Sequence, residues 1–115
     1  MRILVIDDEP SVRELFAVAL GRKGHEVDTA ADGEEALERL VAGEYDVVFL
    51  DIVLGAGMDG FEVFDEIRRL GLGGRVILMT GRPSDDKLMR YAEQADAFLK
   101  KPIQGLHHIL TAVDG

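Results

Sequence analysis

The sequence predicts an α/β domain in which helices cover both faces of a parallel sheet. Two observations predict it. Short, β-branched apolar segments recur at the spacing of a helix and its loops, and the stretches between them carry apolar residues at helical periodicity. Right-handed crossovers between parallel strands then distribute the helices over both faces. With 115 residues the chain has the length of one domain, so we expect a single domain over residues 1–115.

Five apolar segments are the expected strands. The first, third and fourth are almost continuously apolar, which is typical of strands buried on both faces of a parallel sheet. The second is the weakest signal of the five. The strands are expected over residues 3–6, 25–29, 47–50, 76–79 and 97–99.

Five amphipathic segments alternate with these strands. The first opens at Pro10, a residue suited to the first turn of a helix. The first three segments are followed by glycines that end helices, at Gly21, Gly43 and Gly71. The fourth and fifth helices are expected over residues 85–94 and 106–113.

The composition bounds the kind of function. The chain has 22 acidic against 13 basic residues and a formal net charge of −9, which argues against direct nucleic-acid binding because phosphates need cationic partners. It has no cysteine, which excludes disulfides and thiolate metal sites and fits the cytoplasmic location that we expect. The longest apolar run is far too short to cross a membrane.

Polar side chains suited to chemistry follow four of the expected strands. In open parallel sheets, ligands bind outside the carboxyl ends of the strands. If these four strands are neighbours, their terminal residues therefore converge on one pocket. In chain order the residues are Asp7, Asp8 and Glu9, then Asp51, then Thr80 and Gly81, and finally Lys100, Lys101 and Pro102.

This set of side chains favours a divalent cation and phosphoryl transfer. Several carboxylates in one small pocket repel one another unless a cation intervenes. Oxygen ligands without His or Cys favour Mg2+, with Mn2+ and Ca2+ as alternatives. A carboxylate can also act as a nucleophile and form an aspartyl phosphate. Each signal alone has an ordinary interpretation, such as a helix cap or a solvated strand end, but together they indicate a site.

Six segments distributed along the chain form a recognisable set. They are ILVIDDEP (residues 3–10), DGEEAL (32–37), DVVFLD (46–51), MDG (58–60), VILMTG (76–81) and AFLKKP (97–102). With these segments, over essentially its whole length, the sequence resembles the receiver domains of two-component response regulators.

The resemblance implies a flavodoxin-like fold, with a doubly wound five-stranded parallel sheet in the order 2-1-3-4-5 and five helices in three α/β/α layers. It also implies that the domain is a signalling switch with Mg2+ as cofactor. Such a switch is a phosphoacceptor with self-catalysed phosphotransfer and autodephosphorylation, and not an enzyme.

The resemblance assigns a phosphoryl acceptor and a metal site. Asp51 stands at the position of the acceptor. Asp7 and Asp8 stand at the positions of the acidic pair, with Asp8 as a direct Mg2+ ligand and Asp7 acting through water. The backbone carbonyl of Val53, two residues after the acceptor, is implied as a further ligand.

The resemblance also assigns the residues of a switch. Thr80 matches the hydroxyl that moves to bond the phosphoryl group, and Lys101 matches the lysine that pairs with a phosphoryl oxygen. The bond between Lys101 and Pro102 is expected to be cis. Phe98 stands at the position of the aromatic residue that turns inward on activation, although an ordinary core residue of a strand is an equally favoured interpretation.

The implied phosphodonor is a phosphohistidine on a sensor histidine kinase or on a histidine phosphotransfer protein. The implied output surface consists of the fourth helix, the fifth strand and the fifth helix, which is also a candidate homodimer surface. One departure concerns residues 52–59, where the loop is one residue longer than is usual and has no proline. A Gly-containing loop of this kind resembles receivers attached to hybrid histidine kinases.

Two other functions compete with the phosphoacceptor. A degenerate receiver would be a phosphorylation-independent protein-binding module, but every residue with a chemical role in the family is present here. A phosphatase of the haloacid dehalogenase kind would need a second aspartate two residues after its nucleophile, and that position is Val53.

Overall fold

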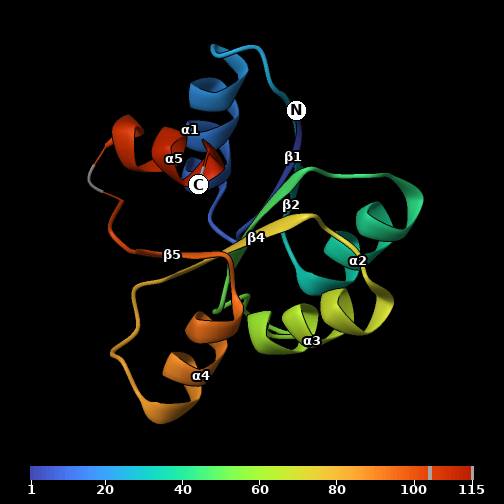
Figure 1. Cartoon of the computed structure of the whole chain (residues 1–115), viewed down its shortest axis with the longest axis vertical. Coiled ribbons are helices and arrows are strands. Elements are labelled where there is room, and N and C mark those ends of the chain that lie inside the picture. The colour runs from blue at the N-terminus through green and yellow to red at the C-terminus, as the bar shows by residue number, and fades with distance from the viewer. Residues whose placement is uncertain (104, 115) are drawn as a thin grey trace.

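Five parallel strands form a single sheet (Figure 1). In chain order they are β1 (Arg2–Ile6), β2 (Glu26–Ala30), β3 (Val47–Asp51), β4 (Arg75–Thr80) and β5 (Ala97–Lys100). Their order across the sheet is β2-β1-β3-β4-β5, which confirms the predicted fold class and strand order. This computed structural model describes residues 1–103 and 105–114.

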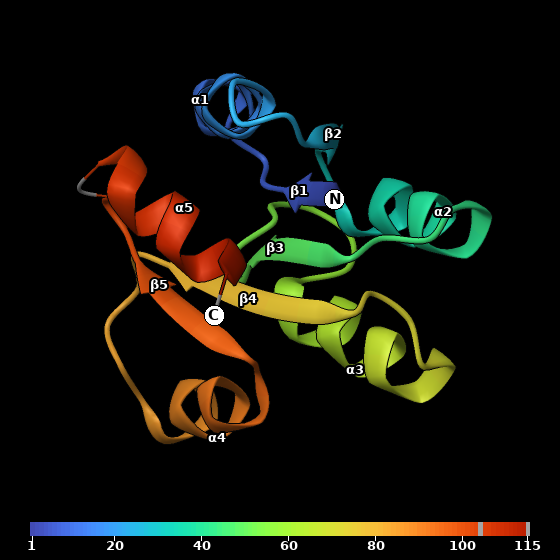
Figure 2. The same cartoon turned by 45° about the horizontal axis from the view of Figure 1, so that its top comes forward.

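Helices cover both faces of the sheet (Figure 2). α1 and α5 pack on one face, where Phe16 and Ile109 join Phe49 of β3 in one buried cluster. The other three helices pack on the opposite face, where Phe64 of α3 and Leu88 of α4 belong to a second cluster. The helices are α1 (Pro10–Gly21), α2 (Gly33–Ala42), α3 (Gly60–Leu70), α4 (Asp86–Gln94) and α5 (Leu106–Asp114). None of the described helices is both long and apolar enough to cross a membrane.

Three helices begin at an aspartate whose side chain caps the first turn. Asp32, Asp59 and Asp85 each accept a hydrogen bond from the backbone amide three residues later. Such a cap stabilises a helix by about 1 kcal/mol. At α3 the cap is reciprocal, because Glu62 also accepts from the Asp59 amide, at 3.1 Å. The start of α3, directly after the loop that follows Asp51, is therefore firmly defined.

The predicted boundaries differ from the observed ones by one residue at β2. The prediction was residues 25–29, whereas the strand runs from Glu26 to Ala30. β2 is an edge strand that pairs only with β1, and most of its residues are partly exposed. Its apolar pattern is therefore weaker than that of a strand buried on both faces.

The carboxyl ends of the central strands lie side by side. Asp51, the last residue of β3, is in register with Met79, and Thr80, the last residue of β4, is in register with Lys100. The residues that follow the four strands therefore share one edge of the sheet, as predicted.

Candidate functional site

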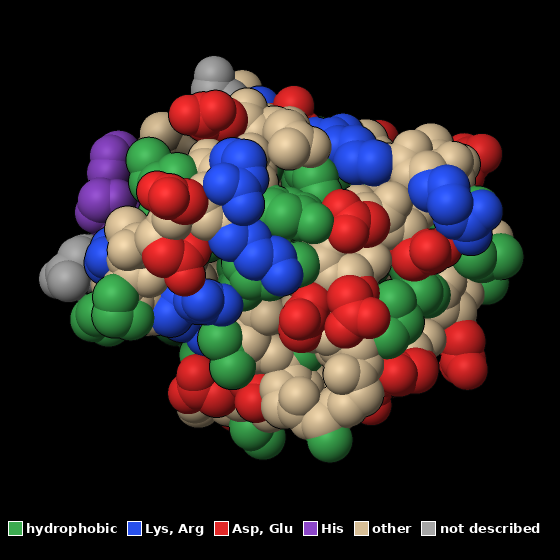
Figure 3. All heavy atoms as spheres, turned by 90° about the horizontal axis from the view of Figure 1, so that it is seen from below, with side chains coloured by type: hydrophobic (Ala, Val, Ile, Leu, Met, Phe, Trp, Pro, Cys, Tyr) green, Lys and Arg blue, Asp and Glu red, His purple; other side chains and the backbone are tan. Residues whose placement is uncertain are grey.

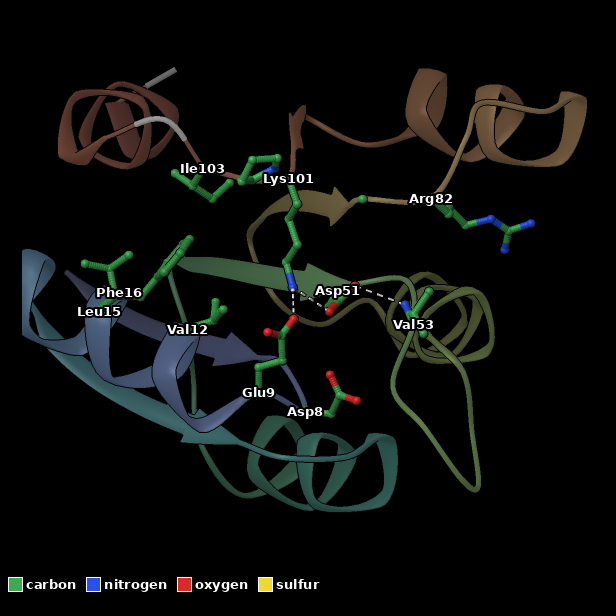
Figure 4. Close-up of a pocket in the computed structure, with 12 residues that line it drawn as sticks. Asp8, Glu9, Val12, Leu15, Phe16, Asp51, Val53, Arg82, Lys101 and Ile103 are labelled. Carbon is green, nitrogen blue, oxygen red and sulfur yellow. Dashed lines mark hydrogen bonds and ion pairs between the residues drawn. The ribbon is translucent and has the colours of Figure 1, made fainter.

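An open cavity of about 740 Å³ lies at this edge, between the ends of the strands and α1 (Figure 4). Its floor is acidic and its α1 side is apolar. Lys101 reaches down into it from the end of β5, while the Arg82 side chain points away. The lining residues are Asp8, Glu9, Val12, Leu15, Phe16, Asp51, Val53, Gly81, Arg82, Lys101, Pro102 and Ile103.

Two buried carboxylates are held in the same way. Asp7 Oδ1 accepts the backbone amide of Glu9 at 2.9 Å, and Asp51 Oδ1 accepts the backbone amide of Val53 at 3.0 Å. Each therefore binds the amide two residues later, the local bond that aspartate makes at a turn. The second oxygen of each carboxylate is left facing Lys101. The Lys101 Nζ lies 2.7 Å from Asp7 Oδ2 and 2.9 Å from Asp51 Oδ2.

The charges at this site are unbalanced. Carboxylate oxygens of Asp7, Asp8, Glu9 and Asp51 all lie within 4.8 Å of one another, and Lys101 is the cation in contact with three of these residues. Asp7 Oδ2 is buried and close enough to Lys101 for an ion pair, but the alignment is not that of a hydrogen bond, so this oxygen lacks a directed donor. An oxygen-only set of four carboxylates fits a hard divalent cation such as Mg2+.

The pKa values of the two central groups, Asp51 and Lys101, are both raised, but for different reasons. Burial raises the pKa of Asp51 to about 6, against the lowering effect of its hydrogen bonds from Lys101 and Val53. Burial would lower the pKa of the Lys101 ammonium, but its contacts with Asp7 and Asp51 outweigh this and raise it. Lys101 is therefore charged at neutral pH, and Asp51 carries a carboxylate that gains much from an added cation.

Thr80 lies fully buried at the end of β4. Its Oγ1 accepts a hydrogen bond from the backbone amide of Arg82 at 3.1 Å. The Arg82 guanidinium is engaged elsewhere, because it pairs with Asp85 at 2.8 Å and stacks over Phe61 at 5.5 Å from the ring centroid. The Thr80 oxygen therefore accepts a hydrogen bond in this structure, while the hydroxyl proton remains available for donation to another group.

Of the remaining predicted residues, Asp8 and Val53 line the cavity, whereas Phe98 is not among its lining residues. Val53 is half exposed beside Asp51, and Asp8 is exposed at the cavity floor. Phe98 is partly buried against the cluster on the α3 and α4 side of the sheet. The peptide bond between Lys101 and Pro102 is cis, as predicted.

Glu9, predicted at this edge of the sheet without an assigned role, and Arg13, which was not predicted, also shape the site. Glu9 Oε1 lies 3.3 Å from Lys101 Nζ. Arg13 on α1 donates to the backbone carbonyl of Asp7 at 2.8 Å and so ties the end of β1 to α1. No sequence pattern indicates Arg13, because its bond to Asp7 spans six residues through a loop and a helix turn.

The face shown in Figure 3, seen from below Figure 1 where α3 and α4 lie, has mixed charge. Acidic and basic side chains are interspersed there, with apolar side chains between them. A partner on this face would be recognised by paired charges and apolar contacts rather than by one sign of charge.

A doubly wound sheet with a carboxylate cluster and a lysine at its carboxyl edge defines a class of α/β domains with a cation-binding, acidic pocket. The sequence matches the response regulator receiver domain over residues 3–114, and the chain belongs to this family. The resemblance seen in the sequence motifs is thereby confirmed.

Relatives of two kinds are similar to this chain. The transcriptional regulatory protein TcrA of Mycobacterium tuberculosis (strain ATCC 25618 / H37Rv) is 43% identical over 103 residues, which cover 89% of this chain and 40% of TcrA. The sensor histidine kinase RcsC of Escherichia coli (strain K12) is 38% identical over 104 residues, covering 90% of this chain and 11% of RcsC. The chain spans less than half the length of these curated relatives.

A solved structure supports the same fold. The response regulator protein TrrA from Thermotoga maritima, in complex with Mg2+-BeF, superposes with a TM-score of 0.80 and is 38% identical in sequence. The match covers 97% of this chain and 97% of that one. A Mg2+ complex in so similar a receiver supports Mg2+ binding in the family.

Proposed function

We propose that this domain is a phosphoacceptor switch in which Asp51 receives a phosphoryl group. The observation that carries the proposal is the pairing of Asp51 with Lys101. One Asp51 oxygen is fixed by the Val53 amide, and the other faces the cavity beside an ammonium group at 2.9 Å. The nucleophile is thereby positioned, and the ammonium is placed to neutralise charge on the transferring phosphoryl oxygens; these are the two requirements of phosphoryl transfer.

The proposed reaction transfers a phosphoryl group from a phosphohistidine to Asp51. An Asp51 carboxylate oxygen attacks phosphorus, the bond from phosphorus to the imidazole nitrogen breaks, and the imidazole takes up a proton. The donor would be a sensor histidine kinase or a histidine phosphotransfer protein in the cytoplasm. Water later attacks phosphorus, the bond to the Asp51 oxygen breaks, and phosphate leaves.

The residues proposed to hold Mg2+ are Asp8, Asp51 and the backbone carbonyl of Val53, with Asp7 acting through water. When bound, the cation supplies positive charge beside the transferring phosphoryl oxygens. The cluster of four carboxylates supports this proposal. Lys101 would neutralise the remaining oxygen charge from the opposite side of the cavity.

Phosphorylation is proposed to act on the rest of the domain through Thr80 and Phe98. A phosphoryl group adds nearly two negative charges and three acceptor oxygens, which attract the Thr80 hydroxyl and the Lys101 ammonium. Thr80 would leave its present bond with the Arg82 amide. The surface of α4, β5 and α5, and Phe98 within it, would then shift between two populated states and present an output or dimer surface.

Beryllofluoride, a mimic of the phosphoryl group, tests this switch without turnover. With Mg2+, it is expected to shift the backbone amide resonances of Thr80, Arg82 and Phe98 in a nuclear magnetic resonance spectrum. The Asp51→Asn variant, and wild type without Mg2+, are expected to show no such shifts. Identical spectra of wild type under all conditions would instead favour the alternative, a degenerate receiver that binds partners without phosphorylation.

A further inference from the structure

The loop between β3 and α3, residues 52–59, is closed tightly at its base. The amide of Gly60 donates to the carbonyl of Ile52 at 2.8 Å, and the amide of Ile52 donates to the carbonyl of Met79 at 3.0 Å. A Cβ atom on Gly60 would lie only 2.3 Å from the Asp51 carbonyl oxygen. The two ends of the loop are therefore fixed directly beside Asp51.

Leu54 and Met58 pack into the core on either side of the middle of the loop, but among the described residues no backbone–backbone hydrogen bond joins residues 55–57 to the rest of the domain. Gly55 and Gly57 both have positive φ, +74° and +85°, a region that glycine enters without steric cost. The loop passes the acidic pair here, since a Cβ atom on Gly55 would lie 3.7 Å from Asp8 Oδ2. Because glycines lose much conformational freedom when they are ordered, a contact from outside the loop would help this segment to keep one conformation.

The N-terminus of α2 supplies that contact. Glu34 Oε1 accepts the backbone amide of Met58 at 3.2 Å. The same oxygen would lie 2.8 Å from a Cβ atom on Gly57, so the carboxylate rests against the loop backbone. A Cβ atom on Gly33 would lie 2.8 Å from Met58 Cβ, so the absence of a side chain at Gly33 makes room for Met58.

The neighbouring glutamate on α2 has different partners. Glu35 Oε1 accepts the backbone amide of Ala31 at 2.8 Å, and Glu35 Oε2 lies 3.7 Å from the Arg39 guanidinium. The two glutamates in the first turn of α2 therefore divide their contacts. Glu35 holds the start of its own helix, and Glu34 holds the loop.

We propose that Glu34 is a positioning residue for the cation site. By holding the Met58 amide, it keeps in one conformation the loop that follows the proposed ligands Asp51 and Val53 and passes Asp8. The inference rests on the proposed function only in taking Mg2+ as the ligand. Without the hydrogen bond from the Met58 amide to Glu34, the loop would lose conformational freedom only when the cation binds. This entropic cost makes the free energy of Mg2+ binding less favourable.

The test measures Mg2+ affinity by calorimetry for wild type, Glu34→Ala, Glu34→Gln and Glu38→Ala. Glu34→Ala is expected to bind Mg2+ about 3- to 10-fold more weakly, the effect of one lost hydrogen bond. Glu34→Gln keeps an acceptor oxygen and is expected to stay within about twofold of wild type. Glu38→Ala removes the same charge from the next turn of α2 without touching the loop backbone, and should also stay within about twofold.

A second measurement separates this inference from the proposed function. Backbone relaxation of the metal-free protein reports loop order directly, and Glu34→Ala is expected to lower the order parameters of residues 55–58 to below about 0.6. If wild type bound no Mg2+, the proposed function would fail while the relaxation data still tested the hydrogen bond from the Met58 amide to Glu34. An unchanged loop in Glu34→Ala, or an equal loss of Mg2+ affinity in Glu38→Ala, would overturn the role of Glu34.

Discussion

Replacing Lys101 by methionine is expected to lower the free energy of unfolding of the metal-free protein by about 3 kcal/mol at pH 7. The reason is that the ammonium group of Lys101 pairs with two buried carboxylates, which stay in place when it is removed. Lys101 contacts Asp7, whose side chain is fully buried, and Asp51, whose side chain is 5% exposed. Removing the cation leaves two like charges facing each other out of water, and one of them must take up a proton or remain unpaired.

The adjacent lysine provides a matched control for this variant. Lys100 is exposed, and Lys100→Met should change the unfolding free energy by less than about 0.5 kcal/mol in urea denaturation. Added Mg2+ should restore most of the stability that Lys101→Met loses, because the cation would replace the missing positive charge. Equal stability of Lys101→Met and wild type without metal would contradict the proposed balance of charges at the site.

Replacing Asp51 by asparagine is expected to have the opposite effect and to stabilise the metal-free protein at pH 7. The pKa of Asp51 is raised from 3.8 in the unfolded chain to about 6 in the folded protein. Its ionised form therefore opposes folding by about 2–3 kcal/mol above pH 6. Below pH 3.8 the carboxyl is protonated in both states and this cost is absent; it grows between pH 3.8 and about 6 and is constant above that.

The pH dependence can be isolated by comparing the two proteins. Other carboxylates titrate in the same range, so the quantity to follow is the difference in unfolding free energy between Asp51→Asn and wild type. This difference should be largest at pH 7 and should vanish towards pH 4. Saturating Mg2+ should shrink it at pH 7, because the cation would stabilise the ionised Asp51 of wild type. A difference that stayed constant with pH would show that burial of Asp51 is not its cause.

The central part of the fold could be predicted because its strands are buried on both faces. Residues 3–6 of β1, 47–50 of β3 and 76–79 of β4 are unbroken apolar segments. The polar residue that directly follows each segment is therefore easy to recognise in the sequence. The convergence of Asp51 and Thr80 then follows from the geometry of parallel strands. The edge strand β2 was displaced by one residue in the prediction, since its partly exposed residues give no such contrast.

The contacts between distant segments could not be predicted from the sequence. The bond between Glu34 and the Met58 amide joins residues 24 positions apart and depends on the space left by Gly33. Nothing in the residue types distinguishes Glu34 from Glu35, yet only one of them faces the loop. Likewise, two adjacent lysines end β5. The resemblance assigns the role of the phosphoryl-binding lysine to Lys101. The structure supplies a physical reason, because Lys101 is the lysine that reaches both buried carboxylates.

The most direct test of the phosphoacceptor proposal is the intact mass of the protein after incubation with acetyl phosphate. Wild type and Asp51→Asn are compared, each with and without Mg2+. We predict that one phosphoryl group is added to wild type only when Mg2+ is present, and that none is added to Asp51→Asn. Absence of an adduct under every condition, or an adduct that persists in Asp51→Asn, would contradict the assignment of Asp51 as the acceptor.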